Sequence, residues 1–191
     1  MNGDLMLANY RMLIKSLDDH ARCVARDYAD HMQCRKGCDG CCQHLSLFWV
    51  EGFALFDALR QKPAAKATEI KRRLGAGLKD RDCPLLEEHG CLLYEARPVI
   101  CRTHGLPLMN GTGEERALHY CPENFRNLET LPGDAVLDME VVNASLATIN
   151  TLFVAEFFGE GPRPSAERHM LADFLCGPAE QWFVDRIGHE T

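Results

Sequence analysis

Eight of the ten cysteines in this 191-residue chain lie in two segments, 34–42 and 83–121, that contain glycines and prolines and show little sign of regular structure. The first stretch has the spacing Cys-x3-Cys-x2-Cys-Cys, and the series continues later with gaps of seven, nine and nineteen residues. Short spacings let successive sulfurs turn toward one centre, as thiolate sites for zinc and for iron–sulfur clusters both require. The pattern therefore predicts metal binding. The candidate ligands are Cys34, Cys38, Cys41, Cys42, Cys83, Cys91, Cys101 and Cys121.

The adjacent pair Cys41 and Cys42 restricts how these ligands can be shared. Neighbouring side chains tend to diverge, so two ligands from one such pair would strain the backbone around a mononuclear metal. A disulfide between neighbours is rare. We therefore expect at most one of the two to bind a given metal ion. Eight thiolates divide into two sets of four, but the sequence does not show which four belong together.

Three other interpretations of the cysteines are weaker. A disulfide framework is disfavoured because we expect a cytoplasmic protein, in which thiols stay reduced. Inert core cysteines would have no reason to gather beside glycines and prolines. The spacing of the first three cysteines also matches radical S-adenosylmethionine enzymes, but a helix precedes the motif and Gly40 replaces the usual aromatic residue. Outside the cluster, Cys23 and Cys176 are expected to be small buried core residues.

The identity of the metal is a choice between an iron–sulfur cluster and zinc. Cys83 and Cys121 are each followed by proline, as some cluster ligands are in bacterial ferredoxins. Arg97 and Arg102 flank Cys101 closely enough to offset the negative charge of a cluster held by thiolates. These features favour an iron–sulfur cluster of the 4Fe–4S type. The alternative is zinc, since two four-cysteine sites could use all eight ligands.

Composition and charge exclude several classes of partner. The net charge is −7 and the pI is near 5.6, which does not favour binding to nucleic acid or to anionic membranes. The N-terminus lacks the unbroken apolar run of a signal peptide. No window approaches the roughly 18 apolar residues of a membrane span. We expect a soluble cytoplasmic protein whose partners are a metal or cluster and, for a redox role, another protein; the oligomeric state stays open.

Hydrophobic periodicity predicts helices at both ends of the chain. They are expected at 4–32 with Asp4 as a cap, 45–61, 64–80, 135–158 with Asp134 as a cap, and from Ser165 to about 175. Residues 83–131 lose this periodicity, with "CLLYE" as a possible short strand and Pro98 opening a short helix that carries Cys101. We therefore predict a mainly α single domain, 1–191. Its helices, including those over 134–188, surround an irregular cysteine-rich metal-binding core at about 34–121, with at most a short β element.

Two quoted segments carry a resemblance to a known family. "CRKGCDGCC", followed by a helix with an acid at Glu51 and then by "CPLL…GCLLYEARPVICR", resembles the CxxCxxCC proteins. These are also called YkgJ-like cysteine cluster proteins and are described as a zinc- or iron-chelating domain. The resemblance covers about residues 34–121 and implies that all eight cysteines are metal or cluster ligands. Cys121 is the one that no local motif anchors.

The resemblance implies metal binding more firmly than any reaction. The family includes flagellin lysine methylases, but the chain shows no separate substrate module that could be matched to one. The favoured function is a redox or electron-transfer protein with an iron–sulfur cluster. The alternatives are a structural zinc protein and a metal- or cluster-dependent group-transfer enzyme. An open coordination position beside a pocket, lined by His44, His104 or Arg102, would favour the enzyme.

Overall fold

The structure, a computed structural model, describes residues 7–75, 83–159 and 167–188 of the chain. The described part is mainly α-helical, as predicted, and contains seven α-helices joined by short strands and turns. The helices are α2 (Ala8–Asp27), α3 (Trp49–Arg60), α4 (Ala64–Gly75), α5 (Val99–Thr103), α6 (Met139–Phe158), α7 (Asp173–Cys176) and α8 (Pro178–Gly188).

Helix α2 packs through a narrow stripe. Its buried residues Tyr10, Leu17 and Val24 recur every seven positions, which keeps them on one face of the helix. The α-helix ends at Asp27 and a 3₁₀ turn follows at Ala29–His31, so the expected helix over 4–32 was too long at its C-terminal end. The predicted cap Asp4 lies outside the described residues.

Helix α3 forms the centre of the core. Eight of its twelve residues are buried, and Trp49 at its start meets the aromatic rings of Phe174 and Phe183 edge-on. Gly52 lies so close to the Phe174 ring that a Cβ would fall 2.3 Å from it. Helices α3, α6, α7 and α8 therefore enclose one aromatic core, and this core supports the rest of the chain.

Helix α6 begins later than the sequence suggested. Asp138, and not the predicted Asp134, is its N-cap, and the Asp138 carboxylate accepts a hydrogen bond from the Glu140 amide. Asp134 instead lies in the 3₁₀ turn Gly133–Ala135, where its carboxylate accepts a hydrogen bond from the Tyr28 hydroxyl. The acid four residues earlier thus ties the preceding loop to α2.

Helix α6 contradicts the prediction that no segment of the chain is apolar enough to span a membrane. By length and composition alone, α6 is apolar enough to cross a bilayer, so the view that no window comes near a span was too strong. One face of α6 packs into the core through residues such as Phe153 and Phe157. On the outer side, Ser145, Thr148 and Thr151 donate to carbonyls four residues earlier.

Strands are more numerous than predicted, although each has only two or three residues. They are β1 (Ser46–Leu47), β2 (Leu86–Glu87), β3 (Gly90–Cys91), β4 (Leu108–Asn110), β5 (Ala117–His119), β6 (Leu137–Asp138) and β7 (His169–Met170). β1 pairs with β7, β2 with β3, and β4 with both β5 and β6. The predicted strand "CLLYE" was largely wrong, because only Cys91 belongs to a strand and Tyr94–Ala96 forms a 3₁₀ turn.

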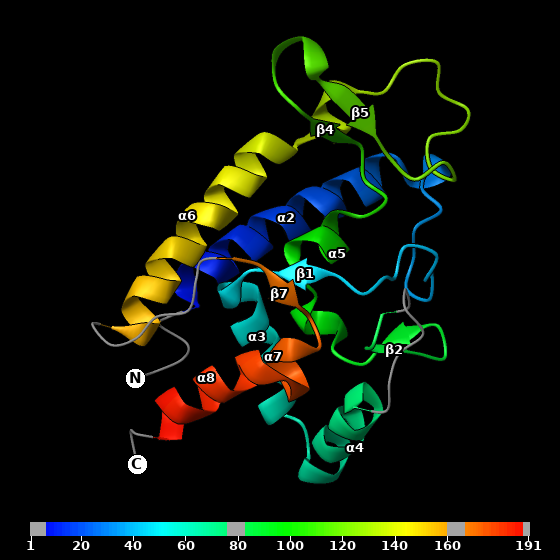
Figure 1. The fold of residues 1–191 in the computed structure, drawn as a ribbon. Coiled ribbons are helices and arrows are strands. Elements are labelled where there is room, and N and C mark those ends of the chain that lie inside the picture. The colour runs from blue at the N-terminus through cyan, green and yellow to red at the C-terminus, as the bar shows by residue number, and fades with distance from the viewer. Residues whose placement is uncertain (1–6, 76–82, 160–166, 189–191) are drawn as a thin grey trace.

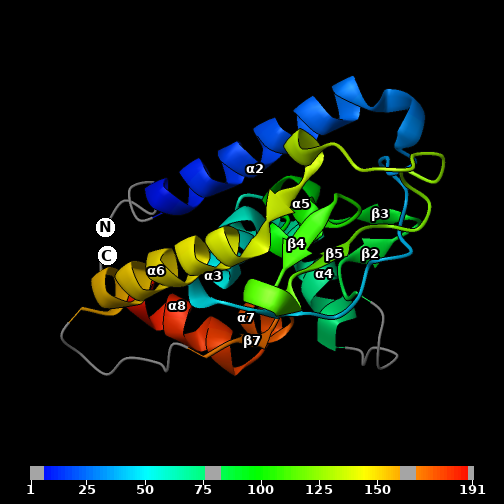
Figure 2. The same cartoon turned by 90° about the horizontal axis from the view of Figure 1, so that it is seen from above.

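The long helices and the cysteine-bearing loops occupy different regions of the molecule. Helices α2 and α6 run side by side in opposite directions, with α3, α7 and α8 packed beneath them (Figures 1 and 2). The loop after α2 and the β2–β3 hairpin lie together on the far side of Figure 1 from α8. A second small core of Val24, Leu106, Phe125 and Ala135 fixes the 121–135 loop against the end of α2.

Candidate metal centre

Two tight turns shape the first cysteine loop. The Cys38 amide donates to the Arg35 carbonyl at 3.0 Å, and the Cys42 amide donates to the Asp39 carbonyl at 2.8 Å. Gly37 has φ +97°, which the third position of a type II turn requires. Consecutive turns therefore present Cys38, Cys41 and Cys42 from one short loop.

A hairpin brings two later cysteines together. Cys91 pairs with Leu86 across β2 and β3, and the Leu86 amide donates to the Cys83 carbonyl at 3.0 Å. The two-residue turn of this hairpin, Glu88 and His89, has φ of 45° and 63°. Such a turn is favourable for Asn-Gly and strained for these residues. The His89 ring is 2.8 Å from the Asp39 carboxylate, so the turn is tied to the first cysteine loop.

Helix α5 carries Cys101, and its start is held by a buried acid. Pro98 is the N-cap residue, in agreement with the expected short helix. One carboxylate oxygen of Glu51 accepts a hydrogen bond from the Val99 amide and the other accepts one from the Phe48 amide, both at 3.1 Å. Glu51 is only 1% exposed, and burial raises its pKa. This one side chain joins the starts of α3 and α5.

Asn124 organises another part of the site and was missed by sequence reasoning. It is fully buried (0% exposed), and its side-chain oxygen accepts from the Gln33 amide at 2.7 Å and from the Cys34 amide at 3.3 Å. Its Nδ2 donates to the Gly105 carbonyl at 2.6 Å and to Cys34 Sγ at 3.3 Å. Its backbone amide donates to the Cys121 carbonyl. Asn124 therefore places Cys34 beside the Cys121 segment, although no motif marked it.

One cavity of about 260 Å³ collects most of the cysteines. Its wall contains seven of the eight predicted ligands, namely Cys34, Cys38, Cys41, Cys42, Cys83, Cys91 and Cys101. All ten cysteines are described by the structure and all are free thiols, so no disulfide competes with metal binding there. Cys121 does not line this cavity.

We describe the eight predicted ligands as two sets of four, chosen from the cysteines that most affect one another's pKa, although the sets are in contact at Cys41 and Cys42. We call Cys42, Cys83, Cys91 and Cys101 the inner set. Burial, with smaller contributions from Cys83, Cys91 and Cys42, raises the pKa of Cys101 to about 12. Burial also raises the pKa of Cys83 to about 11, with smaller contributions from Cys91 and Cys42.

The other four cysteines form the outer set, Cys34, Cys38, Cys41 and Cys121. Burial raises the pKa of Cys34; Asn124 lowers it, and Cys121, Cys38 and Cys41 raise it further. Burial likewise raises the pKa of Cys41, and Cys42, Cys38 and Cys121 add to it. Cys42 is the largest charge influence on Cys41, whereas Cys91 is the largest charge influence on Cys42. The two sets meet at this pair.

The donor chemistry fits a thiophilic metal, but the thiols are not at mononuclear coordination distances. Around tetrahedral zinc with Zn–S near 2.3 Å, sulfurs lie about 3.8 Å apart. Within the described residues, no three His, Cys, Asp or Glu side chains are grouped closely enough to hold a metal ion as they stand. Eight soft donors around one cavity fit zinc or iron–sulfur in type, and metal binding would have to draw the sulfurs together.

A cationic group lies beside the inner set. The Arg97 guanidinium stacks on the Tyr94 ring at 3.7 Å from its centroid, and Lys36 Nζ lies 5.2 Å from the same centroid. The positive charge of Arg97 counteracts the burial that raises the pKa of Cys42, Cys91 and Cys101. The predicted charge-offsetting residue Arg97 is therefore near three of the predicted ligands.

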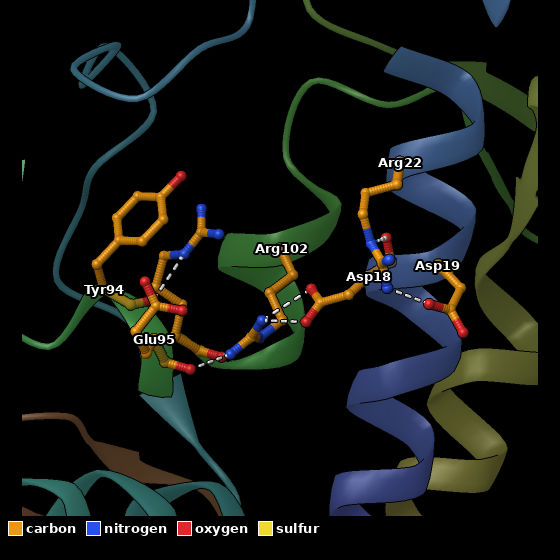
Figure 3. A network of polar contacts seen from close by, with 7 residues as sticks. Asp18, Asp19, Arg22, Tyr94, Glu95 and Arg102 are labelled. Atoms are coloured by element: carbon orange, nitrogen blue, oxygen red, sulfur yellow. Dashed lines mark hydrogen bonds and ion pairs between the residues drawn. The ribbon is translucent and has the colours of Figure 1, made fainter. Parts of the chain in front are cut away.

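Arg102 has a structural partner. Its Nη1 lies 2.7 Å from both carboxylate oxygens of Asp18 on α2, and the side chain is only 7% exposed (Figure 3). It also donates to the carbonyls of Glu95 and Arg97. Arg102 thus fixes α5 and its cysteine to α2, and its predicted role beside a cluster stays a prediction.

Of the two histidines predicted to line an open coordination position, only His104 lies at the cysteine cavity. His104 lines the cysteine cavity and burial lowers its pKa, whereas His44 accepts a hydrogen bond from the Ala172 amide at 3.4 Å. Cys23 and Cys176 are both exposed, so the expectation that they are buried was wrong. Cys23 lies on α2 immediately before the buried Val24, and Cys176 is the last residue of α7.

Comparison with known proteins gives one match. Residues 33–122 match the family model CxxCxxCC, described as "Putative zinc- or iron-chelating domain". This segment contains all eight predicted ligands and excludes Cys23 and Cys176. No curated protein and no solved structure matches the chain.

Proposed function

We propose that this chain, whose residues 33–122 match the CxxCxxCC family of zinc- or iron-chelating domains, is a redox protein with two thiolate metal centres. In this proposal the inner set holds a 4Fe–4S cluster, and the outer set holds a second centre of iron or zinc. The observation that carries the proposal is the convergence of cysteines from three separate segments on one cavity. A cytoplasmic setting, which keeps thiols reduced, is part of the proposal.

Burial favours the inner set as the cluster site. Cys83, Cys91 and Cys101 are all partly buried, and Leu85 and Leu93 beside them are almost fully buried. Low water access and nearby positive charge are the main means by which a protein adjusts a cluster's potential.

The chain's own residues hold and tune this centre. When bound, a 4Fe–4S cluster exchanges single electrons. Arg97 supplies positive charge toward the inner thiolates, and Tyr94 holds Arg97 in place by stacking and by accepting a hydrogen bond at its carbonyl. Glu51 and Arg102 fix α5, which sets the position of Cys101. The outer set is more open, because Cys38 and Cys41 are exposed.

Anaerobic purification with metal and sulfide analysis and a visible spectrum tests the proposal. We expect broad absorption near about 400 nm with stoichiometric iron and sulfide, bleached by dithionite. A colourless protein with tightly bound zinc and no sulfide would replace the cluster by structural zinc sites. A folded protein that takes up neither metal would overturn both.

A further inference from the structure

A second and larger cavity lies beside the cysteine cavity. It has a volume of about 730 Å³ and runs between α2, the end of α3 and residues 91–102. Cys91, Tyr94, Arg97 and Arg102 belong to the walls of both cavities. Figure 3 shows part of the wall of the larger cavity, with Tyr94 and Glu95 on one side, Asp18 on α2 on the other and Arg102 between them. A molecule in the larger cavity would therefore lie next to the inner set.

The charge of this cavity is opposite to that of the chain. The chain carries −7, yet the cavity is lined by six cationic side chains and three acidic ones. The cations are Arg11, Lys15, Arg22, Lys62, Arg97 and Arg102. The acids are Asp18, Asp57 and Glu95. Positive charge concentrated in a cavity of an acidic protein selects anions.

Two of the cationic side chains are available to bind an anionic ligand. Asp18 binds Arg102, Asp57 lies 4.0 Å from Arg11, and Asp19, which is outside the lining, pairs with both Lys15 and Arg22. Lys62 and Arg97, in contrast, have no carboxylate partner within the described residues. The floor between the charged groups is apolar and includes Leu7, Ile14 and Leu93. The lining therefore suits a molecule with an anionic group and an apolar body.

A buried hydroxyl without a partner is the second, independent sign of a ligand. Tyr10 belongs to the cavity wall and is 3% exposed, and its hydroxyl has no hydrogen-bond partner within the described residues. Such an unsatisfied group costs stability unless something else uses it. Burial raises the pKa of Tyr10 well above its ordinary value, so the hydroxyl stays a donor at neutral pH.

We propose that this cavity binds a carboxylate-bearing organic anion with an apolar chain, held by Lys62, Arg97 and the Tyr10 hydroxyl. The inference goes beyond the proposed redox function and does not depend on which metal is bound. The proposal places a small-molecule binding site next to the metal centre, and a protein that only transfers electrons to another protein would not need such a site. A hydroxyl kept unsatisfied in the free protein is then explained by its use in binding.

Calorimetric titration of the purified full chain with octanoate tests the proposal, with octylammonium and octanol as probes of the same length. We expect saturable 1:1 binding of octanoate alone. Tyr10→Phe should weaken it about tenfold. Lys62→Gln should weaken it about threefold. The matched controls Tyr28→Phe and Lys66→Gln, which change residues outside the cavity lining, should bind as the wild type does.

Two further readouts separate binding from folding and from the metal. Tyr10→Phe should unfold at the same temperature as the wild type or higher, because it removes only an unsatisfied oxygen. Its metal content should be unchanged, so a loss of octanoate binding is not a loss of the centre. Equal binding of octylammonium, absence of octanoate binding, or wild-type affinity in both cavity variants would overturn the proposal.

Discussion

The Asn124→Asp substitution tests how the outer set is assembled. It changes one NH2 group to oxygen with almost no change of shape. The two Nδ2 contacts, to the Gly105 carbonyl at 2.6 Å and to Cys34 Sγ at 3.3 Å, lose their donor. An unsatisfied buried carbonyl costs about 1–3 kcal/mol. A carboxyl at a site that is 0% exposed adds a comparable desolvation cost, so we expect a loss of about 3 kcal/mol or more.

For a chain of this length, that loss lowers the melting temperature by roughly 6–12 °C. The new negative charge would also lie beside Cys34, so the outer set should lose metal while the inner set keeps its own. Thermal unfolding and metal analysis measure the two effects. Asn143→Asp, the same change on the exposed side of α6, should shift stability by less than about 0.5 kcal/mol. Wild-type stability and full metal content in Asn124→Asp would refute the reasoning.

Three further variants test the supports of the site. Glu51→Gln leaves one of two buried amides without an acceptor and should cost about 1–2 kcal/mol in urea unfolding at neutral pH. Because burial raises the pKa of Glu51 in the folded state above 4.5, Glu51 loses its proton at lower pH in the unfolded state than in the folded state. The difference in unfolding free energy between the wild type and this variant should therefore shrink as pH rises from about 4 toward the folded pKa. A difference that stays constant with pH would contradict this. Gly105→Ala should lower metal content, since a Cβ there would lie 2.3 Å from Cys34 Sγ at a φ of +91°; unchanged metal content would argue against this packing. Glu88→Asn combined with His89→Gly should raise the melting temperature by roughly 2–4 °C by relieving the strained turn, and a lower value would show that the His89–Asp39 contact matters more.

Much of the helical architecture could be predicted because it follows from local patterns. The stripe of Tyr10, Leu17 and Val24 on α2 and the apolar run that becomes α3 are visible as periodicity. The start of α6 was placed too early because Asp134 and Asp138 are both good caps. Only the pairing of β6 with β4, which takes Leu137 and Asp138 into a sheet, decides between them.

The candidate site could be predicted in its ligands but not in its supports. Cysteine spacing identifies eight residues, and the family match covers all of them. Asn124 is a single residue about ninety positions from Cys34, and nothing local marks an asparagine that folding brings there. Arg102 is next to Cys101 in sequence, yet its guanidinium pairs with Asp18, because the direction of a side chain depends on which helix packs against it.

The most direct test of the central claim is the metal content of paired cysteine variants. Cys34→Ala with Cys121→Ala removes half of the outer set, and Cys83→Ala with Cys101→Ala removes half of the inner set. We expect each double variant to lose one centre and keep the other, and a control with Cys23→Ala and Cys176→Ala to keep both. Complete loss of metal in either ligand variant would show a single centre, and full retention in both would show that these cysteines do not hold the metal.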